Sequence, residues 1–137
     1  MTDTAQSANL ATAQRLLLIT GRALLGLYFI VPGITKITGW TAMSAYMAQH
    51  GVPLVPVLLV LTIVLQIGGG ACLAIGYRTQ LMALLLAGLT LVISVFMHDF
   101  WNTYDGTDPG HETQNFIKNL AIMAGLLCVA GSRDQRS

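Results

Sequence analysis

The stretch Arg15–Lys36, RLLLITGRALLGLYFIVPGITK, is almost continuously apolar and decides the fold. A helix needs roughly 20 mostly apolar residues, at 1.5 Å rise each, to cross a bilayer. The stretch has that length, so it predicts a membrane-spanning helix over residues 15–38. Charge at membrane depth is costly and usually has a partner. The three cations of this stretch are therefore candidate functional residues: Arg15, Arg22 and Lys36.

Three further apolar runs follow in a chain of 137 residues that is 54% hydrophobic and only 9% charged. Soluble domains average about 25% charged residues, so this composition excludes an ordinary soluble domain. The net charge of +1 is uninformative about nucleic acid, but the chain lacks the basic patch that phosphate binding needs, so we expect no nucleic acid partner. We expect an all-α fold, an integral membrane four-helix bundle, with spans over residues 15–38, 56–75, 80–98 and 112–131.

The remaining segments are polar and short. We expect a frayed N-terminal tail over residues 1–14, a membrane domain over 15–131 and a C-terminal tail over 132–137. No basic residue precedes Arg15, so the positive region of a signal peptide is missing, and we expect the first helix to be retained as an anchor.

A short interfacial helix is predicted between spans one and two. Trp40, Met43 and Met47 recur at helical spacing, and Tyr46 suits the headgroup zone. Gly51 then marks the end of this helix.

The distribution of Lys and Arg predicts the orientation, because cytoplasmic loops carry the excess of these residues. With four spans both termini lie on one side, which holds Arg15, Arg78, Arg133 and Arg136. The other side holds Lys36, Lys118 and the acidic loop between spans three and four. We therefore expect a multi-pass protein of a bacterial inner membrane, with both termini in the cytoplasm and the acidic loop outside.

The two cysteines, Cys72 and Cys128, both lie within apolar runs, near the cytoplasmic ends of their spans. Structural disulfides rarely persist on that reducing side. We interpret both as buried small apolar residues rather than as a redox pair.

One face of the first span is unusual. Steps of three and four residues place Arg22, Gly26, Phe29, Gly33 and Lys36 on one narrow stripe. Two cations and two glycines on one stripe indicate a face that is turned into the bundle. The alternative is a lipid-facing Arg22 that extends its side chain to the inner interface.

Several polar side chains should meet near the outer membrane surface. Lys36 ends the first span, His98 and Asp99 end the third, and Asn115, Lys118 and Asn119 share a face of the fourth. We predict a ligand-binding polar pocket there, in which Asp99 is the counter-ion of Lys36 or Lys118 and His98 can move a proton near neutral pH. The alternative is a set of ordinary hydrated helix ends. His98, His111 and the loop acids lack a reliable metal-ligand spacing, so we assign no metal site. The predicted pocket comprises Lys36, His98, Asp99, Lys118 and Asn119.

Five segments, in this order and spacing, resemble the DoxX family of membrane proteins over essentially the whole chain after the tail. They are GRALLGLYFIVPGITKITG, GVPLVP, QIGGGACLAIGYRTQ, FMHDFW and FIKNLAIMAGLL. The family usually has a glutamate before the glycines of the second span, whereas this chain has Gln66, an amide that does not titrate. Polar positions of the family coincide with Arg22, Lys36, Gln66, His98 and Asn119. We expect two of these, Arg22 and Gln66, to be buried polar residues within the spans.

The resemblance implies an inner-membrane four-helix bundle linked with quinone-coupled oxidation of sulfur compounds, or with redox maturation and oxidative-stress complexes. Our first hypothesis is a redox-linked, quinone-associated subunit, that is, a quinone-linked oxidoreductase subunit without an intrinsic cofactor. Its partners would be the lipid bilayer and other membrane or redox proteins, or a second copy. The alternatives are a non-enzymatic scaffold or assembly factor and a small oligomeric transporter.

Overall fold

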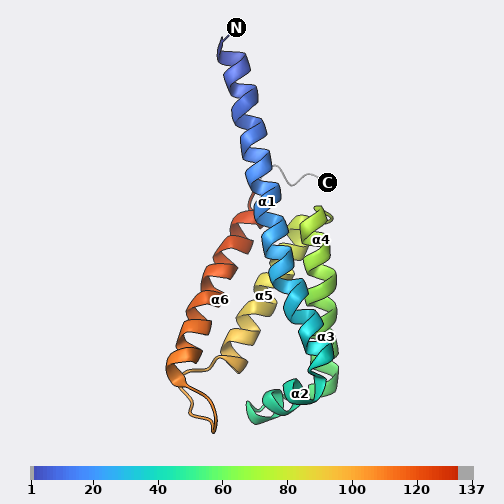
Figure 1. Cartoon of the computed structure of the whole chain (residues 1–137), viewed down its shortest axis with the longest axis vertical. Helices are drawn as coiled ribbons and strands as arrows, with labels where there is room; N and C mark the ends of the chain where they lie inside the picture. The colour runs from blue at the N-terminus through green and yellow to red at the C-terminus, as the bar shows by residue number, and fades with distance from the viewer. Residues whose placement is uncertain (1, 133–137) are drawn as a thin grey trace.

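The computed structural model describes residues 2–132, which form helices joined by short loops (Figure 1). Val55–Ile75 is continuous through its π-helical middle, so the described chain has four helices long and apolar enough to cross a membrane. The expected all-α architecture is confirmed. The elements are α1 (Thr2–Thr38), α2 (Trp40–Gln49), α3 (Val55–Val64), η1 (Leu65–Gly69), α4 (Gly70–Ile75), α5 (Thr79–Met97) and α6 (Pro109–Ala130).

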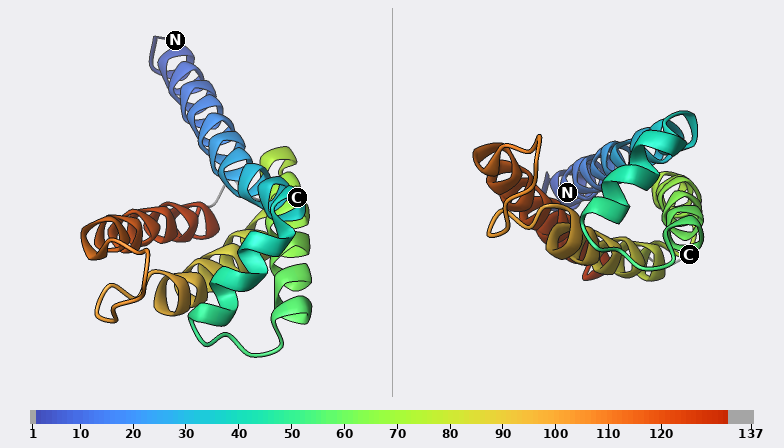
Figure 2. Two further views of the ribbon diagram at one scale, coloured as in Figure 1. Left: turned by 60° about the horizontal axis from the view of Figure 1, so that its bottom comes forward. Right: turned by 90° about the horizontal axis from the view of Figure 1, so that it is seen from below.

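The long helices run antiparallel, so that α1 begins and α6 ends at the same end of the bundle (Figure 1). α1 packs along η1 and α4, and α5 packs along α6. The short helix α2 crosses the opposite end of the bundle, as the view from below shows (Figure 2). Met43 and Met47 of α2 pack on Leu59 and Met97 beneath it, whereas Trp40 is exposed. The predicted interfacial helix is therefore present and covers the end of the bundle.

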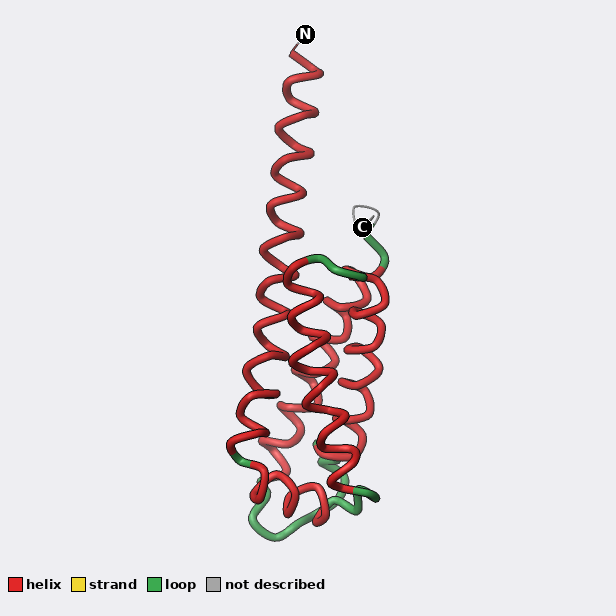
Figure 3. The backbone as a smooth tube through the Cα atoms, turned by 90° about the vertical axis from the view of Figure 1, so that its right-hand side faces the viewer, coloured by secondary structure: helices red, strands yellow, loops and turns green. Residues whose placement is uncertain are grey.

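The N-terminal residues differ from the expected frayed tail, because α1 is helical from Thr2. Asp3 lies in the first turn, where a carboxylate favours the helix dipole, and several alanines follow. The extension stands clear of the other helices (Figure 3). Of the predicted C-terminal tail, residues 133–137 lie outside the described part of the chain.

The fourth span also begins earlier than predicted, at Pro109 instead of near residue 112. The Asp108 side chain caps the helix by accepting a hydrogen bond from the Gly110 amide at 3.1 Å. Proline suits the first helical position because its missing N–H has no partner there. The Asp-Pro-Gly sequence therefore begins the fourth span.

The predicted stripe on α1 does face the bundle. Gly26, Phe29 and Gly33 are buried, and the Phe29 ring lies in the main apolar core with Leu73 and Leu86. Gly26 lies directly against α4, since a Cβ built on it would be 2.5 Å from the Gly70 carbonyl oxygen. Only glycine allows the two backbones to approach so closely.

Arg22 lies at the inner end of this stripe, against the C-terminal end of α4. A Cβ on Gly76, which has a φ of +86°, would lie 2.9 Å from Arg22 Nη1. A cation is favourable at a helix C-terminus because of the helix dipole. The side chain is therefore turned toward a neighbouring helix end and not into lipid.

Candidate functional site

A cavity of about 240 Å³ lies between α1, α5 and α6, toward the end covered by α2. We call it the polar pocket. Four of the five residues predicted for the outer site line it, namely Lys36, His98, Lys118 and Asn119, and only Asp99 does not. The full lining is Tyr28, Phe29, Pro32, Lys36, Gln66, Thr90, Ile93, His98, Asn115, Lys118 and Asn119.

Each polar residue reaches the polar pocket from the end or the middle of a helix. Lys36 lies in the last turn of α1, and His98 follows the last residue of α5. Asn119 is buried on α6, and its Oδ1 accepts a hydrogen bond of 3.3 Å from the Tyr28 hydroxyl of α1. This bond ties α6 to α1 across the pocket.

Gln66 lines the polar pocket from a local irregularity of the second span. It lies in η1, a single π-helical turn that inserts one extra residue into the helix. α1 has Gly33 opposite, where a Cβ would lie 3.2 Å from the Gln66 Cβ and 2.6 Å from a side-chain carbon of Ile67. The glycine therefore leaves the room that the π-helical turn occupies. The sequence indicated Gln66 as a buried polar residue but gave no sign of the π-helical turn.

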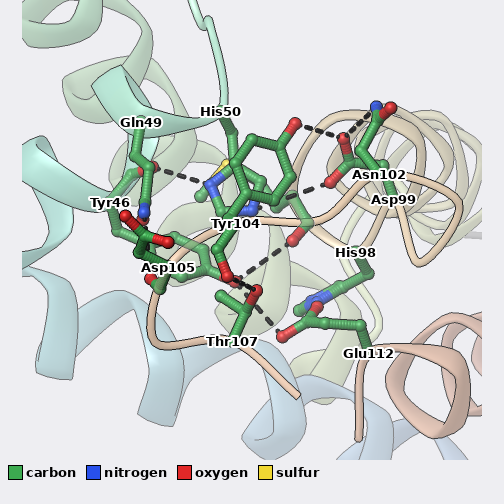
Figure 4. A network of polar contacts seen from close by, with 11 residues as sticks. Tyr46, Gln49, His50, His98, Asp99, Asn102, Tyr104, Asp105, Thr107 and Glu112 are labelled. Carbon is green, nitrogen blue, oxygen red and sulfur yellow. Dashed lines mark hydrogen bonds and ion pairs between the residues drawn. The ribbon is translucent and has the colours of Figure 1, made fainter. Parts of the chain in front are cut away.

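His98 is paired with a carboxylate that the sequence analysis did not select. His98 Nδ1 lies 2.7 Å from Glu112 Oε2 of α6 (Figure 4). The Tyr46 hydroxyl of α2 lies 3.3 Å from Glu112 Oε1 and 3.2 Å from the Met97 carbonyl. Burial and the nearby Glu112 carboxylate raise the pKa of Tyr46 to about 12, so it stays a neutral hydrogen-bond donor. These contacts fix α2 over the ends of α5 and α6.

Asp99 does not serve as the counter-ion of a lysine, and that prediction is wrong. No ion pair within the described residues joins it to Lys36 or Lys118. Its Oδ2 accepts hydrogen bonds from Tyr104 at 2.6 Å and Asn102 at 2.9 Å, and its Oδ1 lies 3.6 Å from His50 Nε2. The side chain turns into the loop between α5 and α6 because donors there are closer.

His50, at the end of α2, is the centre of the polar contacts that surround Asp99. It is buried, and its ring stacks between Tyr46 and Tyr104 with both ring centroids 4.2 Å away. Gln49 adds a hydrogen bond of 3.1 Å to the Asp105 carbonyl (Figure 4). These contacts attach α2 to the acidic loop. The sequence analysis did not predict this attachment. In the sequence, only the spacing of Tyr46 and His50, four residues apart on one face of a short helix, indicated that these two side chains act together.

Two further cavities adjoin the polar pocket and share lining residues with it. The first, of about 220 Å³, lies under α2 and shares Lys36, Ile93 and His98 with the polar pocket. We call it the connecting cavity. It shares Met47, Thr62, Ile93 and Met97 with a groove of about 560 Å³ between α3 and α5. This apolar groove is lined almost entirely by hydrophobic side chains, among them Leu58, Leu85 and Phe96.

The two cysteines and His111 do not line these cavities. Cys72 is half-buried and Cys128 is exposed on α6, so the expected burial is wrong for Cys128, and both are free thiols. Within residues 2–132, no three His, Cys, Asp or Glu side chains lie close enough to hold a metal ion. His111 is exposed near the start of α6.

Comparison with known proteins gives consistent results. The chain matches the DoxX family over residues 17–99. It is 36% identical over 112 residues to inner membrane protein YqjF of Escherichia coli K12, covering 82% of this chain and 80% of that protein. It is 27% identical over 128 residues to inner membrane protein YphA of the same organism, covering 93% and 91%.

A shorter similarity, 32% identity over 71 residues, covers 52% of this chain and 23% of the ER-derived vesicles protein ERV29 of Saccharomyces cerevisiae. No solved structure matches the chain. The family match spans more than half of the chain and agrees with the four apolar helices. This protein is an integral membrane protein that belongs to the DoxX family.

Proposed function

We propose that this protein binds a quinone near the outer surface of the membrane and serves a membrane redox system. The supporting observation is the succession of polar pocket, connecting cavity and apolar groove, each sharing lining residues with the next. A quinone has a polar ring and a long apolar tail, and ligand sites combine apolar walls with a few placed polar groups. The polar pocket would suit the ring of a quinone, and the apolar groove would suit its tail.

The polar pocket supplies the groups that a quinone ring needs. Lys36 and Asn119 offer N–H donors to a ring carbonyl, and Phe29 and Ile93 offer apolar walls for the ring. The connecting cavity lies beneath α2 and shares Met47 and Met97 with the groove. In the expected orientation, with both termini in the cytoplasm, the ring lies in the outer half of the bilayer. Redox partners would then donate or accept electrons from that side.

Gly88 of α5 allows a direct test, because it lines the apolar groove and a Cβ on it would meet nothing within 4 Å. Gly88→Leu should fold normally and fill the groove. We expect it to weaken binding of a long-tailed quinone about tenfold or more, since several buried methylenes lose their contacts at about 0.8 kcal/mol each. Binding of a tailless benzoquinone should not change. Titration of purified protein in lipid nanodiscs, followed by tryptophan fluorescence quenching, measures both affinities.

Gly21→Leu is the matched control, because Gly21 is also a glycine of a spanning helix whose Cβ would meet nothing within 4 Å. It should bind both quinones like the wild type. The proposal is wrong if the wild type binds neither quinone. It is also wrong if Gly88→Leu and Gly21→Leu bind the long-tailed quinone equally well.

A further inference from the structure

Both lysines of the chain line the polar pocket, and neither is paired with an acid within the described residues. Lys36 is half-buried in the last turn of α1, and Lys118 is exposed on α6. A cation within a spanning helix usually pairs with an acid or lies on the path of a substrate. The ion pairs within residues 2–132 involve only histidines as the cationic partner, so both lysines are available to an occupant of the pocket.

The carboxylates nearest to the polar pocket are turned away from it. Asp99 Oδ2 accepts a hydrogen bond of 2.6 Å from Tyr104 in the loop between α5 and α6 (Figure 4). Glu112 accepts a hydrogen bond of 3.3 Å from the Tyr46 hydroxyl and lies 2.7 Å from His98 Nδ1. No acid of the described chain lines the polar pocket, the connecting cavity or the apolar groove. The lysine charges at the pocket are therefore not neutralised by a carboxylate in its wall.

The uncharged neighbours of the lysines add hydrogen-bond donors. Asn119 Oδ1 accepts the hydrogen bond from Tyr28 at 3.3 Å, and the amide of Asn119 retains two N–H donors. Asn115 lies one turn earlier on α6 and also lines the pocket. A lysine carries three N–H donors at the end of a flexible stem, so its charge follows an occupant of the cavity that it lines. Ammonium and amide groups together suit an oxygen that bears a negative charge.

We infer that the polar pocket selects an anionic ring ligand, one that carries an ionised oxygen, over a neutral ring of the same shape. The inference rests on the proposed function, from which it takes the quinone ring, and it adds the charge of the ring that the site prefers. Lys36 and Lys118 neutralise the ionised oxygen, while Phe29 and Ile93 form apolar walls for the ring. A neutral carbonyl accepts weaker hydrogen bonds from the same groups, because charge on both partners strengthens the bond.

Two naphthoquinones of nearly equal shape test this preference. The ring of 2-hydroxy-3-methyl-1,4-naphthoquinone is ionised at pH 7, whereas 2,3-dimethyl-1,4-naphthoquinone is neutral. Substitution at both ring positions also prevents addition of the free thiols Cys72 and Cys128 to the ring. We expect the ionised ring to bind the wild type about tenfold more tightly than the neutral ring. Isothermal titration in nanodiscs of zwitterionic lipid measures both affinities, and empty nanodiscs correct for partition into lipid.

Variants of the two lysines assign the preference to their charges. Methionine suits a spanning helix and has a side chain of similar length without charge, so the double variant Lys36→Met/Lys118→Met should bind both rings with the affinity of the neutral ring for the wild type. Lys36→Arg/Lys118→Arg keeps both charges and should keep the preference. Arg15→Met is the control, because it removes one cation from an exposed position of α1 at the other end of the bundle, and it should leave both affinities unchanged.

A second pair of probes separates this inference from the function on which it rests. 2-Naphthoate is an anion and 2-naphthamide is neutral, and neither is a quinone. If naphthoate binds more tightly than naphthamide but neither quinone binds, the proposed function fails and the preference for anionic rings stands. If the two quinones bind the wild type equally well, the inference fails and the proposed function stands. If none of the four probes binds, both fail.

The variants add two results that would overturn the inference. A preference that persists in Lys36→Met/Lys118→Met would have another source than the lysines of the polar pocket. A preference that Arg15→Met lowers as much as the double variant does would reflect the total charge of the protein and not the pocket.

Discussion

Asp99 is kept as a carboxylate by hydrogen-bond donors in its own loop. Burial raises the pKa of its carboxyl group, but the hydrogen bonds from Asn102 and Tyr104 and the proximity of His50 outweigh burial and hold the pKa below its ordinary value. The hydrogen bond that Tyr104 donates to Asp99 raises the pKa of the Tyr104 hydroxyl. A group whose pKa is lowered by folding stabilises the folded state above its unfolded-state pKa, near 4 for Asp. That stability is lost as the pH falls through the lower, folded-state value.

Tyr104→Phe should therefore destabilise the protein in a pH-dependent way. The substitution keeps the ring that stacks on His50 and removes the hydroxyl that donates to Asp99. We expect the unfolding midpoint in detergent to fall by a few degrees at pH 7. Well below pH 4 the difference from wild type should vanish, because Asp99 is then protonated in both proteins.

Tyr77→Phe is the control, since Tyr77 is an exposed tyrosine at the other end of the bundle. Its midpoint should match that of the wild type at both pH values. A Tyr104→Phe difference that is equally large at pH 7 and at a pH well below the lowered folded-state pKa of Asp99 would mean that the hydroxyl acts through packing and not through the Asp99 charge.

Asp99 also illustrates what the sequence could and could not predict about the site. Helical periodicity and the positions of the span ends were enough to group Lys36, His98, Lys118 and Asn119, and all four line one cavity. Opposite charge alone suggested a lysine partner for Asp99. Its real partners lie three and five residues ahead in an irregular loop, whose path has no periodicity from which to infer it.

At the scale of elements, the contact between α1 and α4 depends on two glycines. A Cβ on Gly26 would lie 2.5 Å from the Gly70 carbonyl oxygen, and a Cβ on Gly70 would lie 2.7 Å from the Gly26 carbonyl oxygen. Both obstacles are backbone atoms, so neither can be relieved by rotating a side chain. The two helices would have to separate.

Gly26→Ala is therefore expected to destabilise the protein by about 1–3 kcal/mol, the usual range for overpacking a core. Thermal unfolding in nanodiscs measures the change. Gly21→Ala on the same helix is the control, because its Cβ would meet nothing within 4 Å. It should be neutral or slightly stabilising, since alanine favours a helix by up to about 1 kcal/mol over glycine. Equal midpoints for the two variants would contradict the close backbone contact.

The elements themselves were largely predictable, because four long apolar runs have few alternatives to spanning helices. Three details were not. The π-helical turn at Leu65–Gly69 depends on packing against Gly33 of another helix. The helical start at Thr2 and the cap at Asp108 depend on local propensities, whereas the sequence analysis expected a frayed tail at residues 1–14 and a fourth span from residue 112.

On the scale of the whole molecule, the two ends of the bundle differ in chemistry. One end carries Arg15, Arg22 and Arg78 together with the helical extension of α1. The other carries α2, the acidic loop and the polar pocket. The expected cytoplasmic location of the basic end therefore decides which leaflet a pocket ligand enters from, and on which side its protons are exchanged.

Labelling of single cysteines tests that orientation. In a background with Cys72→Ala and Cys128→Ala, Thr103→Cys places a thiol in the exposed loop between α5 and α6, and Ser7→Cys places one on the exposed extension of α1. Because Lys and Arg are retained in the cytoplasm, we expect a membrane-impermeant maleimide to label Thr103→Cys in intact spheroplasts. Ser7→Cys should react only after lysis, which also proves that its thiol is accessible. Labelling of Ser7→Cys but not of Thr103→Cys in intact spheroplasts would reverse the topology. The polar pocket would then open toward the cytoplasm, and a quinone bound there would exchange protons with that compartment.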